Sequence, residues 1–128
     1  MATTDEVRLA VPAMPEFLRL ARVTAAGLAS RLGFSFDEVE DLRLAIDELC
    51  YGLTGSTGQD GTVQVRFLLG TDSLLVEGEG HFASATQPTL SELSEVILAA
   101  LVDEHELGPG PHGPTFRLLK RHHGTPGR

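Results

Sequence analysis

Asp47 and Glu48 are the residues whose type and position could serve catalysis. They lie in a segment whose apolar spacing predicts a helix, where adjacent residues are about 100° apart around the axis. At least one of the two carboxylates should therefore avoid the core. A carboxylate that projects from a helix over a pocket can act as a general base toward an attacking hydroxyl. A solvated acidic face is the alternative, and it is the commoner role of such residues.

Motifs for phosphate and metal binding are missing from the sequence. A phosphate loop needs glycines ahead of a helix, and the chain has neither a Walker loop nor a dinucleotide loop. Gly78-Glu79-Gly80 follows a predicted strand but leads into no helix start, which by itself is typical of a turn. The histidines show no paired ligand spacing, and the single Cys50 is typical of a small buried apolar side chain. No metal site is predicted.

Composition narrows the class of protein. The 128 residues, 41% hydrophobic and 22% charged, fit one compact domain with a single core. A formal charge of −8 would repel nucleic-acid phosphates. No apolar run approaches the roughly 20 residues of a membrane span, and the first residues are acidic where a secretory signal is basic. We expect a cytoplasmic protein that binds neither nucleic acid nor membrane directly.

Apolar periodicity and turn residues predict the order strand, helix, helix, strand, strand, helix, strand. Pro15 suits the first turn of the first helix, and Gly33 suits its end. Capping boxes at Ser35 with Glu38, and at Thr89 with Glu92, predict the starts of the second and third helices. The predicted strands cover 7–11, 63–67, 74–77 and the neighbourhood of 116–118; the predicted helices cover 15–33, 35–53 and 89–101.

The fold class that accommodates this order is α+β. We expect a two-layer sandwich in which three helices cover one face of a mixed, mostly antiparallel sheet. In the first helix, Phe17, Leu20, Leu28 and Leu32 are expected to point broadly toward the core. The whole chain, 1–128, is interpreted as one domain, with an ordered core of about 6–121 and a disordered tail at 122–128.

The segment from Val11-Pro-Ala-Met-Pro-Glu-Phe to Asp-Leu-Arg-Leu-Ala-Ile-Asp-Glu-Leu-Cys50 resembles the anti-sigma factor serine kinases. This family belongs to the gyrase, chaperone and histidine-kinase ATPase superfamily. The resemblance is close over residues 7–54 and looser over the next two strands. It implies a reduced histidine-kinase-like ATPase fold and a homodimer formed through the sheet edge and the first helix.

The sequence departs from this family at the nucleotide-binding motifs. The family's second helix carries Glu-x-x-x-Asn, in which the Glu aids phosphoryl transfer and the Asn holds magnesium. Glu48 matches the Glu, but the Asn position is Gly52. The family's Asp-x-Gly, whose Asp reads adenine, corresponds to Gly78 through Gly80, and no glycine-rich lid precedes the third helix. Glu48 would then be a vestigial general base, and neither ATP nor magnesium is expected as a cofactor.

The resemblance also implies a surface for protein partners. Ala21-Arg22-Val23-Thr24 is similar to the family segment whose Arg contacts the sigma factor or, alternatively, its antagonist. Arg19 lies one helical turn earlier and could extend the same patch. From the residues alone, Arg22 is more typical of a solvated helix residue; with the resemblance, a partner contact becomes an equal alternative. Arg19, Arg22 and Thr24 are the predicted partner-binding residues.

The resulting hypothesis is an anti-sigma factor that sequesters a sigma factor without kinase activity and is controlled by an anti-anti-sigma antagonist. An active ATP-dependent kinase that phosphorylates the antagonist on serine is the alternative, and it would need ATP and magnesium. A third hypothesis is a module that senses another small ligand in the vestigial pocket.

Overall fold

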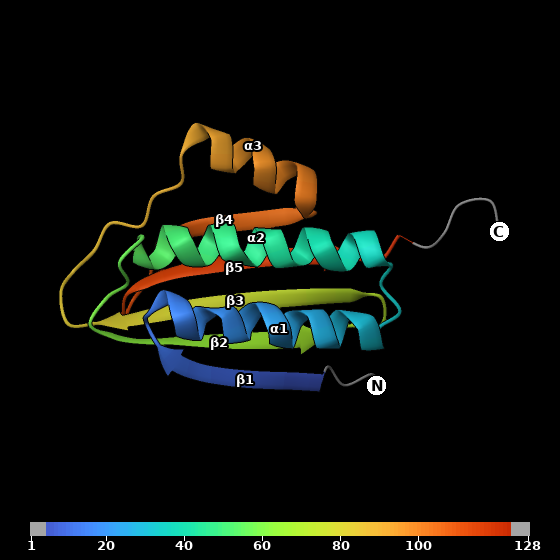
Figure 1. The fold of residues 1–128 in the computed structure, drawn as a ribbon, viewed down its shortest axis with the longest axis horizontal. Coiled ribbons are helices and arrows are strands. Elements are labelled where there is room, and N and C mark those ends of the chain that lie inside the picture. The colour runs from blue at the N-terminus through green and yellow to red at the C-terminus, as the bar shows by residue number, and fades with distance from the viewer. Residues whose placement is uncertain (1–4, 124–128) are drawn as a thin grey trace.

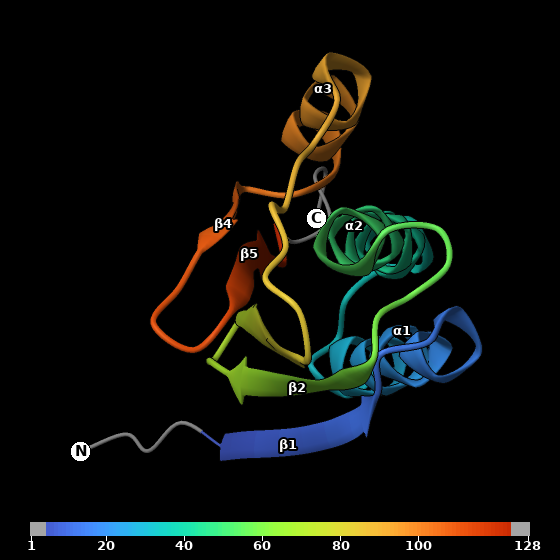
Figure 2. The same cartoon turned by 90° about the vertical axis from the view of Figure 1, so that its left-hand side faces the viewer.

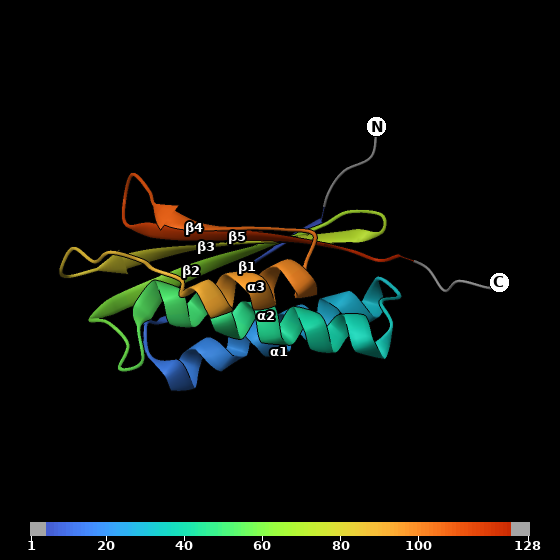
Figure 3. The ribbon, with the colours of Figure 1, turned by 90° about the horizontal axis from the view of Figure 1, so that it is seen from above.

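A computed structural model describes residues 5–123 and shows five strands and three helices. The helices form one layer against one face of the sheet, and the other face is left open (Figure 1 and Figure 3). The strand order is β1-β2-β3-β5-β4. The elements are β1 (Asp5–Pro12), α1 (Pro15–Arg31), α2 (Phe36–Thr54), β2 (Gly61–Leu69), β3 (Ser73–Phe82), α3 (Glu92–Leu101), β4 (Glu104–Pro109) and β5 (Pro114–Arg121).

The predicted α+β sandwich is confirmed, with two differences in the sheet. Every strand pair within residues 5–123 is antiparallel, so the sheet is not mixed. The sequence analysis also missed β4, which pairs with β5 and forms one edge of the sheet. It is short, and its residues are only half-buried or exposed, so it lacks the strict alternation of apolar side chains that predicts a strand.

Local signals placed most of the element ends correctly. Ser35 Oγ accepts from Glu38 N at 3.1 Å, and Glu38 Oε1 accepts from Ser35 N at 2.8 Å, so the predicted capping box starts α2. Gly33 ends α1 with φ 88°, the left-handed conformation that glycine adopts most easily. The predicted box at Thr89 is wrong, because α3 begins at Glu92 and Ser91 Oγ caps it by accepting from Ser94 N at 3.0 Å.

The core lies between the helices and the inner face of the sheet. Large side chains fill it, including Phe67, Phe116, Leu42, Ile46, Leu49 and Leu98. The apolar stripe predicted for α1 is only partly correct, because Phe17 and Leu20 are 42% and 46% exposed. The residues that α1 buries are smaller on average: Leu18, Ala21, Ala25 and Ala29. Three alanines on this face let the helix approach the sheet closely, which leaves the larger neighbours on the flank.

The residues that follow β5 are held against α2. His122 Nδ1 lies 2.7 Å from Glu38 Oε1, and His123 N donates to Glu38 Oε2 at 2.9 Å. The His122 ring stacks on Phe34 with centroids 5.7 Å apart. His122 and His123 were predicted to begin a disordered tail, but contacts with α2 order them; residues 124–128 lie outside the described part of the chain.

Between residues 5 and 123, the helices are too short or too polar to cross a membrane.

Candidate functional site

Gly52 is the position on α2 that the sequence analysis matched to the family's magnesium-holding asparagine, and apolar side chains fill the space beside it. A Cβ built on Gly52 would lie 2.8 Å from Leu107 Cδ2 and 3.1 Å from Leu90 Cδ2. The carbonyl oxygen of Thr89 would lie 3.1 Å away. Leu90 comes from the segment before α3, and Leu107 comes from β4. Neither an asparagine side chain nor a metal ion fits this position without displacing the two leucines.

Gly78 and Gly80 lie inside β3 rather than in a turn, contrary to the prediction. Both face the helix layer, and aromatic rings occupy the space where their side chains would be. A Cβ on Gly78 would lie 2.6 Å from Phe116 Cζ, and one on Gly80 would lie 2.7 Å from Phe82 Cε2. Glycine is needed here because the two rings approach the strand backbone closely. The ring of Phe116 therefore fills the space beside Gly78, the position that the sequence analysis matched to the family's adenine-reading aspartate.

Glu48 points to the same region, toward α3. Its Oε1 accepts a 2.7 Å hydrogen bond from Ser94 Oγ, and its side chain is half-buried. Asp47 turns to the opposite side and pairs with Arg22, so the two adjacent carboxylates fasten α2 to different helices. The sequence analysis considered a solvated acidic face and a general base for Asp47 and Glu48. Neither role accounts for the contacts observed, because each carboxylate joins α2 to another helix.

The arrangement around Gly52 and Gly78 does not fit a magnesium nucleotide. Leucine and phenylalanine side chains offer no ligand to a metal and no hydrogen bond to adenine. Within residues 5–123, no group of three or more His, Cys, Asp or Glu residues is placed to hold a metal ion. The polar side chain of Glu48 also lies in this region, and its hydrogen bond to Ser94 draws α3 against α2.

A cleft between α1 and α2 brings together two of the three predicted partner-binding residues. Arg19 and Arg22 line it with Asp47 and Tyr51, and its volume is about 250 Å³. Arg22 Nη1 donates to Asp47 Oδ2 at 2.9 Å, while Arg22 Nε is buried without a hydrogen-bond partner among the described residues. Thr24 is half-buried and does not line the cleft, so the predicted trio is only partly assembled.

Sequence reasoning missed Tyr51 and the pairing of Arg22 with Asp47. Tyr51 is 62% exposed near the end of α2, and nothing in the local pattern distinguishes it from other exposed residues. The opposite charges of Arg22 and Asp47 can be read from the sequence. That they form a pair depends on the antiparallel packing of α1 against α2.

Cys50 lines the same cleft from its buried side. Burial raises the pKa of its thiol to about 12, and the nearby charge of Asp47 adds to the effect. The thiol is therefore protonated and unreactive at neutral pH, as expected for a small apolar residue.

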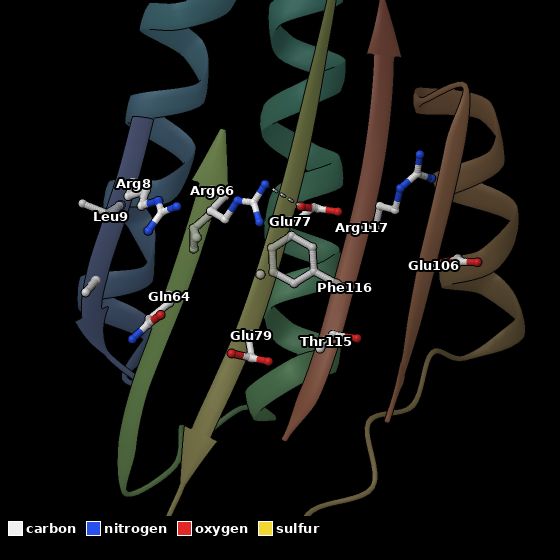
Figure 4. Close-up of a pocket in the computed structure, with 13 residues that line it drawn as sticks. Arg8, Leu9, Gln64, Arg66, Glu77, Glu79, Glu106, Thr115, Phe116 and Arg117 are labelled. Carbon is white, nitrogen blue, oxygen red and sulfur yellow. Dashed lines mark ion pairs between the residues drawn. The ribbon is translucent and has the colours of Figure 1, made fainter. Parts of the chain in front are cut away.

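The open face of the sheet carries a cavity of about 610 Å³. Figure 4 shows its side chains standing in rows across the strands, with Arg66 reaching toward Glu77. One row consists of Arg8, Arg66, Glu77, Arg117 and Glu106. Four of these five side chains are paired within the sheet: Arg66 with Glu77 at 3.6 Å, Arg117 with Glu104 at 3.0 Å, and Arg8 with Glu6. Such cross-strand pairs stabilise an exposed sheet face and assign it no chemistry.

Comparison with known proteins identifies relatives that are named serine-protein kinase RsbW. The protein from Bacillus pumilus is 40% identical over 77 residues, which cover 56% of this chain and 48% of the relative. The Bacillus subtilis protein is 37% identical over 81 residues, which cover 59% of this chain and 51% of the relative. The Listeria monocytogenes protein is 39% identical over 83 residues, which also cover 59% of this chain and 51% of the relative. The chain spans about half the length of these relatives. No family model matches it.

A solved structure shares the fold. The crystal structure of the RsbU and RsbW domains of a Mycobacterium tuberculosis protein superposes with a TM-score of 0.62 and 18% sequence identity. The match covers 94% of this chain and 32% of the other. This likeness confirms the predicted histidine-kinase-like ATPase fold.

Proposed function

Starting from the homology of the chain to the RsbW serine-protein kinases, we propose that it is an anti-sigma factor that acts by binding alone. The observation that carries this proposal is the packing of Leu90 and Leu107 against Gly52. It adds to the motif comparison, because it concerns what fills the space beside the position that the motif assigns to the metal ligand. Under this proposal, the protein acts through its surface.

The same packing speaks against the family's phosphoryl transfer. Such transfer depends on positioning and on neutralising phosphate charge, which metal ions and polar donors supply. Here the magnesium position is enclosed by leucines, the adenine position is occupied by Phe116, and the segment before α3 places Leu90 where a mobile lid would lie.

ATP with magnesium is expected not to bind the chain appreciably. The physical reason is that binding would have to expel Leu90 and Leu107 from apolar contacts and would gain no metal ligand at Gly52. Isothermal titration calorimetry measures this directly. A micromolar dissociation constant, equivalent to about 8 kcal/mol, would contradict the proposal.

The alternative function, an active kinase that phosphorylates an antagonist protein, is favoured by the retention of Glu48 and by the name of the relatives. Under our proposal, Glu48→Ala leaves sequestration of the sigma factor near the wild-type level. It removes the bond to Ser94 and should lower stability by about 1 kcal/mol. Inhibition of transcription in a purified system gives the readout, and Ser94→Ala, which breaks the same bond, is the control. Loss of phosphoryl transfer to the antagonist in Glu48→Ala alone would support the kinase.

The partner surface in this proposal includes Arg19 and Arg22 at the cleft. Arg22→Ala is expected to weaken binding of the sigma factor by about 2 kcal/mol, because buried arginines at interfaces are frequent hot spots. Its effect on folding should stay below about 1 kcal/mol, since the pair with Asp47 is partly exposed. Affinity and thermal unfolding should be measured on one preparation, with Arg31→Ala in the last turn of α1 as control. Equal affinity of wild type and Arg22→Ala would remove Arg22 from the interface.

We also propose a homodimer formed at β1 and the flank of α1. β1 is an edge strand of the described sheet, and Figure 2 shows α1 above it. Phe17 and Leu20, which the structure leaves half-exposed on α1, would lose water contact in such a dimer. They lie on the side of α1 away from Arg19 and Arg22, so a dimer formed there would leave the cleft accessible.

A further inference from the structure

We propose that the outer face of α3 is a docking surface for a basic, amphipathic helix of a second protein. α3 (Glu92–Leu101) belongs to the helix layer, and α2 lies between it and α1 (Figure 2). The surface is therefore separate from the cleft between α1 and α2. The inference goes beyond the proposed function and does not depend on it.

An apolar stripe runs along the side of α3 that faces away from the protein. Leu93 and Val96 are each 68% exposed, and the exposed Ala100 continues the stripe at helical spacing. Leu98 lies on the opposite side of the helix and is fully buried. A helix that is apolar on both sides is normally covered on both sides. Between residues 5 and 123, only the side of Leu98 is covered.

Polar contacts on the inner side of α3 fix its orientation. Ser94 Oγ donates to Glu48 Oε1 at 2.7 Å, and Lys120 Nζ donates to the carbonyl oxygen of Leu101 at 2.6 Å. Lys120 is only 7% exposed, so its ammonium group is held at the C-terminal end of the helix, where a positive charge is favourable. Turning the stripe inward would break both bonds. The stripe is therefore buried only when another segment covers it.

The charges around the stripe are acidic and favour a basic occupant. Between Arg66 and Arg117 the sequence contains no lysine or arginine. Glu92 and Glu95 are exposed in the first turn of α3, and the exposed Asp103 follows its end. A segment with lysines or arginines beside its apolar residues complements these carboxylates. A second copy of the chain, with its formal charge of −8, would bring like charges, and so would a nucleic acid or an anionic membrane.

The occupant is helical because α3 offers side chains and not backbone groups. The N–H and C=O groups in the interior of a helix are bonded within it, so an extended peptide finds no strand edge to pair with. A second helix can place its side chains between those of the stripe. The exposed Ala99 and Ala100 let such a helix come close at the C-terminal end of α3.

The absence of tryptophan from the chain gives the test a clear signal. The probe is a synthetic helix of about 18 Ala, Leu and Lys residues with one Trp on its apolar face, so its fluorescence reports on the peptide alone. We expect a saturable blue shift of the emission when the full chain is added. An isomeric peptide with its leucines and lysines spread evenly around the helix should bind about tenfold more weakly or worse. A peptide with Glu in place of Lys should not bind.

Variants of the protein locate the binding surface. Val96→Gln and, independently, Leu93→Gln should each weaken binding of the amphipathic peptide about tenfold. Val23→Gln is the matched control, because Val23 is 60% exposed on α1 and should leave the affinity unchanged. Glu92→Lys should weaken binding several-fold, whereas Glu16→Lys, in the first turn of α1, should not. Circular dichroism of each variant verifies that it is folded.

Several results would overturn the inference. The amphipathic peptide could bind no better than its isomer, or the α3 variants could lose no more affinity than their controls. Sedimentation equilibrium could show a dimer of the free chain that Val96→Gln dissociates, and the stripe would then belong to a second copy. Anionic vesicles could bind the chain and lose it in Val96→Gln, which would make the stripe a membrane contact. Each of these outcomes leaves the proposed function untouched, because no sigma factor takes part in the measurements.

Discussion

Gly78→Asp is expected to destabilise the protein by about 3 to 5 kcal/mol, or to prevent folding, although it restores the aspartate of the resembling family. Gly78 faces the core, and a Cβ there meets the ring of Phe116 at 2.6 Å. The new carboxylate would also be buried among apolar side chains without a partner. Overpacking and an unpaired charge therefore act together at one position.

Urea unfolding followed by circular dichroism measures this effect. Glu79→Asp is a matched control, because it introduces an aspartate at the next position of β3, on the open face, and should cost less than about 1 kcal/mol. Gly78→Ala separates the two causes, since it adds the Cβ without the charge. Near wild-type stability of Gly78→Asp would show that Phe116 moves aside easily, and it would weaken the case against nucleotide binding.

Glu38→Ala is expected to lower stability by about 2 to 3 kcal/mol. The carboxylate accepts from Ser35 N at the start of α2 and from His123 N, and it also contacts the ring of His122. Its loss removes a helix cap and releases the segment after β5 from α2. Glu40→Ala is the control, because Glu40 makes only an exposed pair with Arg43 and should cost less than about 0.5 kcal/mol. Equal losses in the two variants would show that the contacts of Glu38 are not stabilising.

The lowered pKa of Glu38 predicts that the stability of the protein depends on pH. Desolvation opposes its ionisation, but hydrogen bonds from His123 N, Ser35 N and His122 outweigh it and lower the pKa of Glu38 from 4.5 to about 2. A carboxyl group whose pKa is lower in the folded than in the unfolded state stabilises the fold fully at pH values above its unfolded-state pKa. This stabilisation is lost as the pH falls toward 2. The wild type should therefore lose stability between about pH 4.5 and 2, and Glu38→Gln should lose less in that window. Parallel pH profiles of the two proteins would contradict the assignment.

Features that depend on neighbours within a few residues could be predicted from the sequence. The capping box of Ser35 and Glu38 closes over three residues. The alternation of Val63, Val65 and Phe67 records the two faces of a strand. The motif departures at Gly52 and Gly78 were also visible, because each is a matter of residue type at a known spacing.

The side chains that fill the space of the missing groups, and the surfaces that stay open, depend on how the helices and strands pack together. Leu90 and Leu107 reach Gly52 from distant parts of the chain, and Phe116 reaches Gly78 from another strand. The alanine face of α1 left Phe17 and Leu20 outside, and helix packing joined Arg22 to Asp47. Contacts between residues far apart in the chain form only when helices and strands pack, so periodicity and spacing in one sequence do not specify their partners.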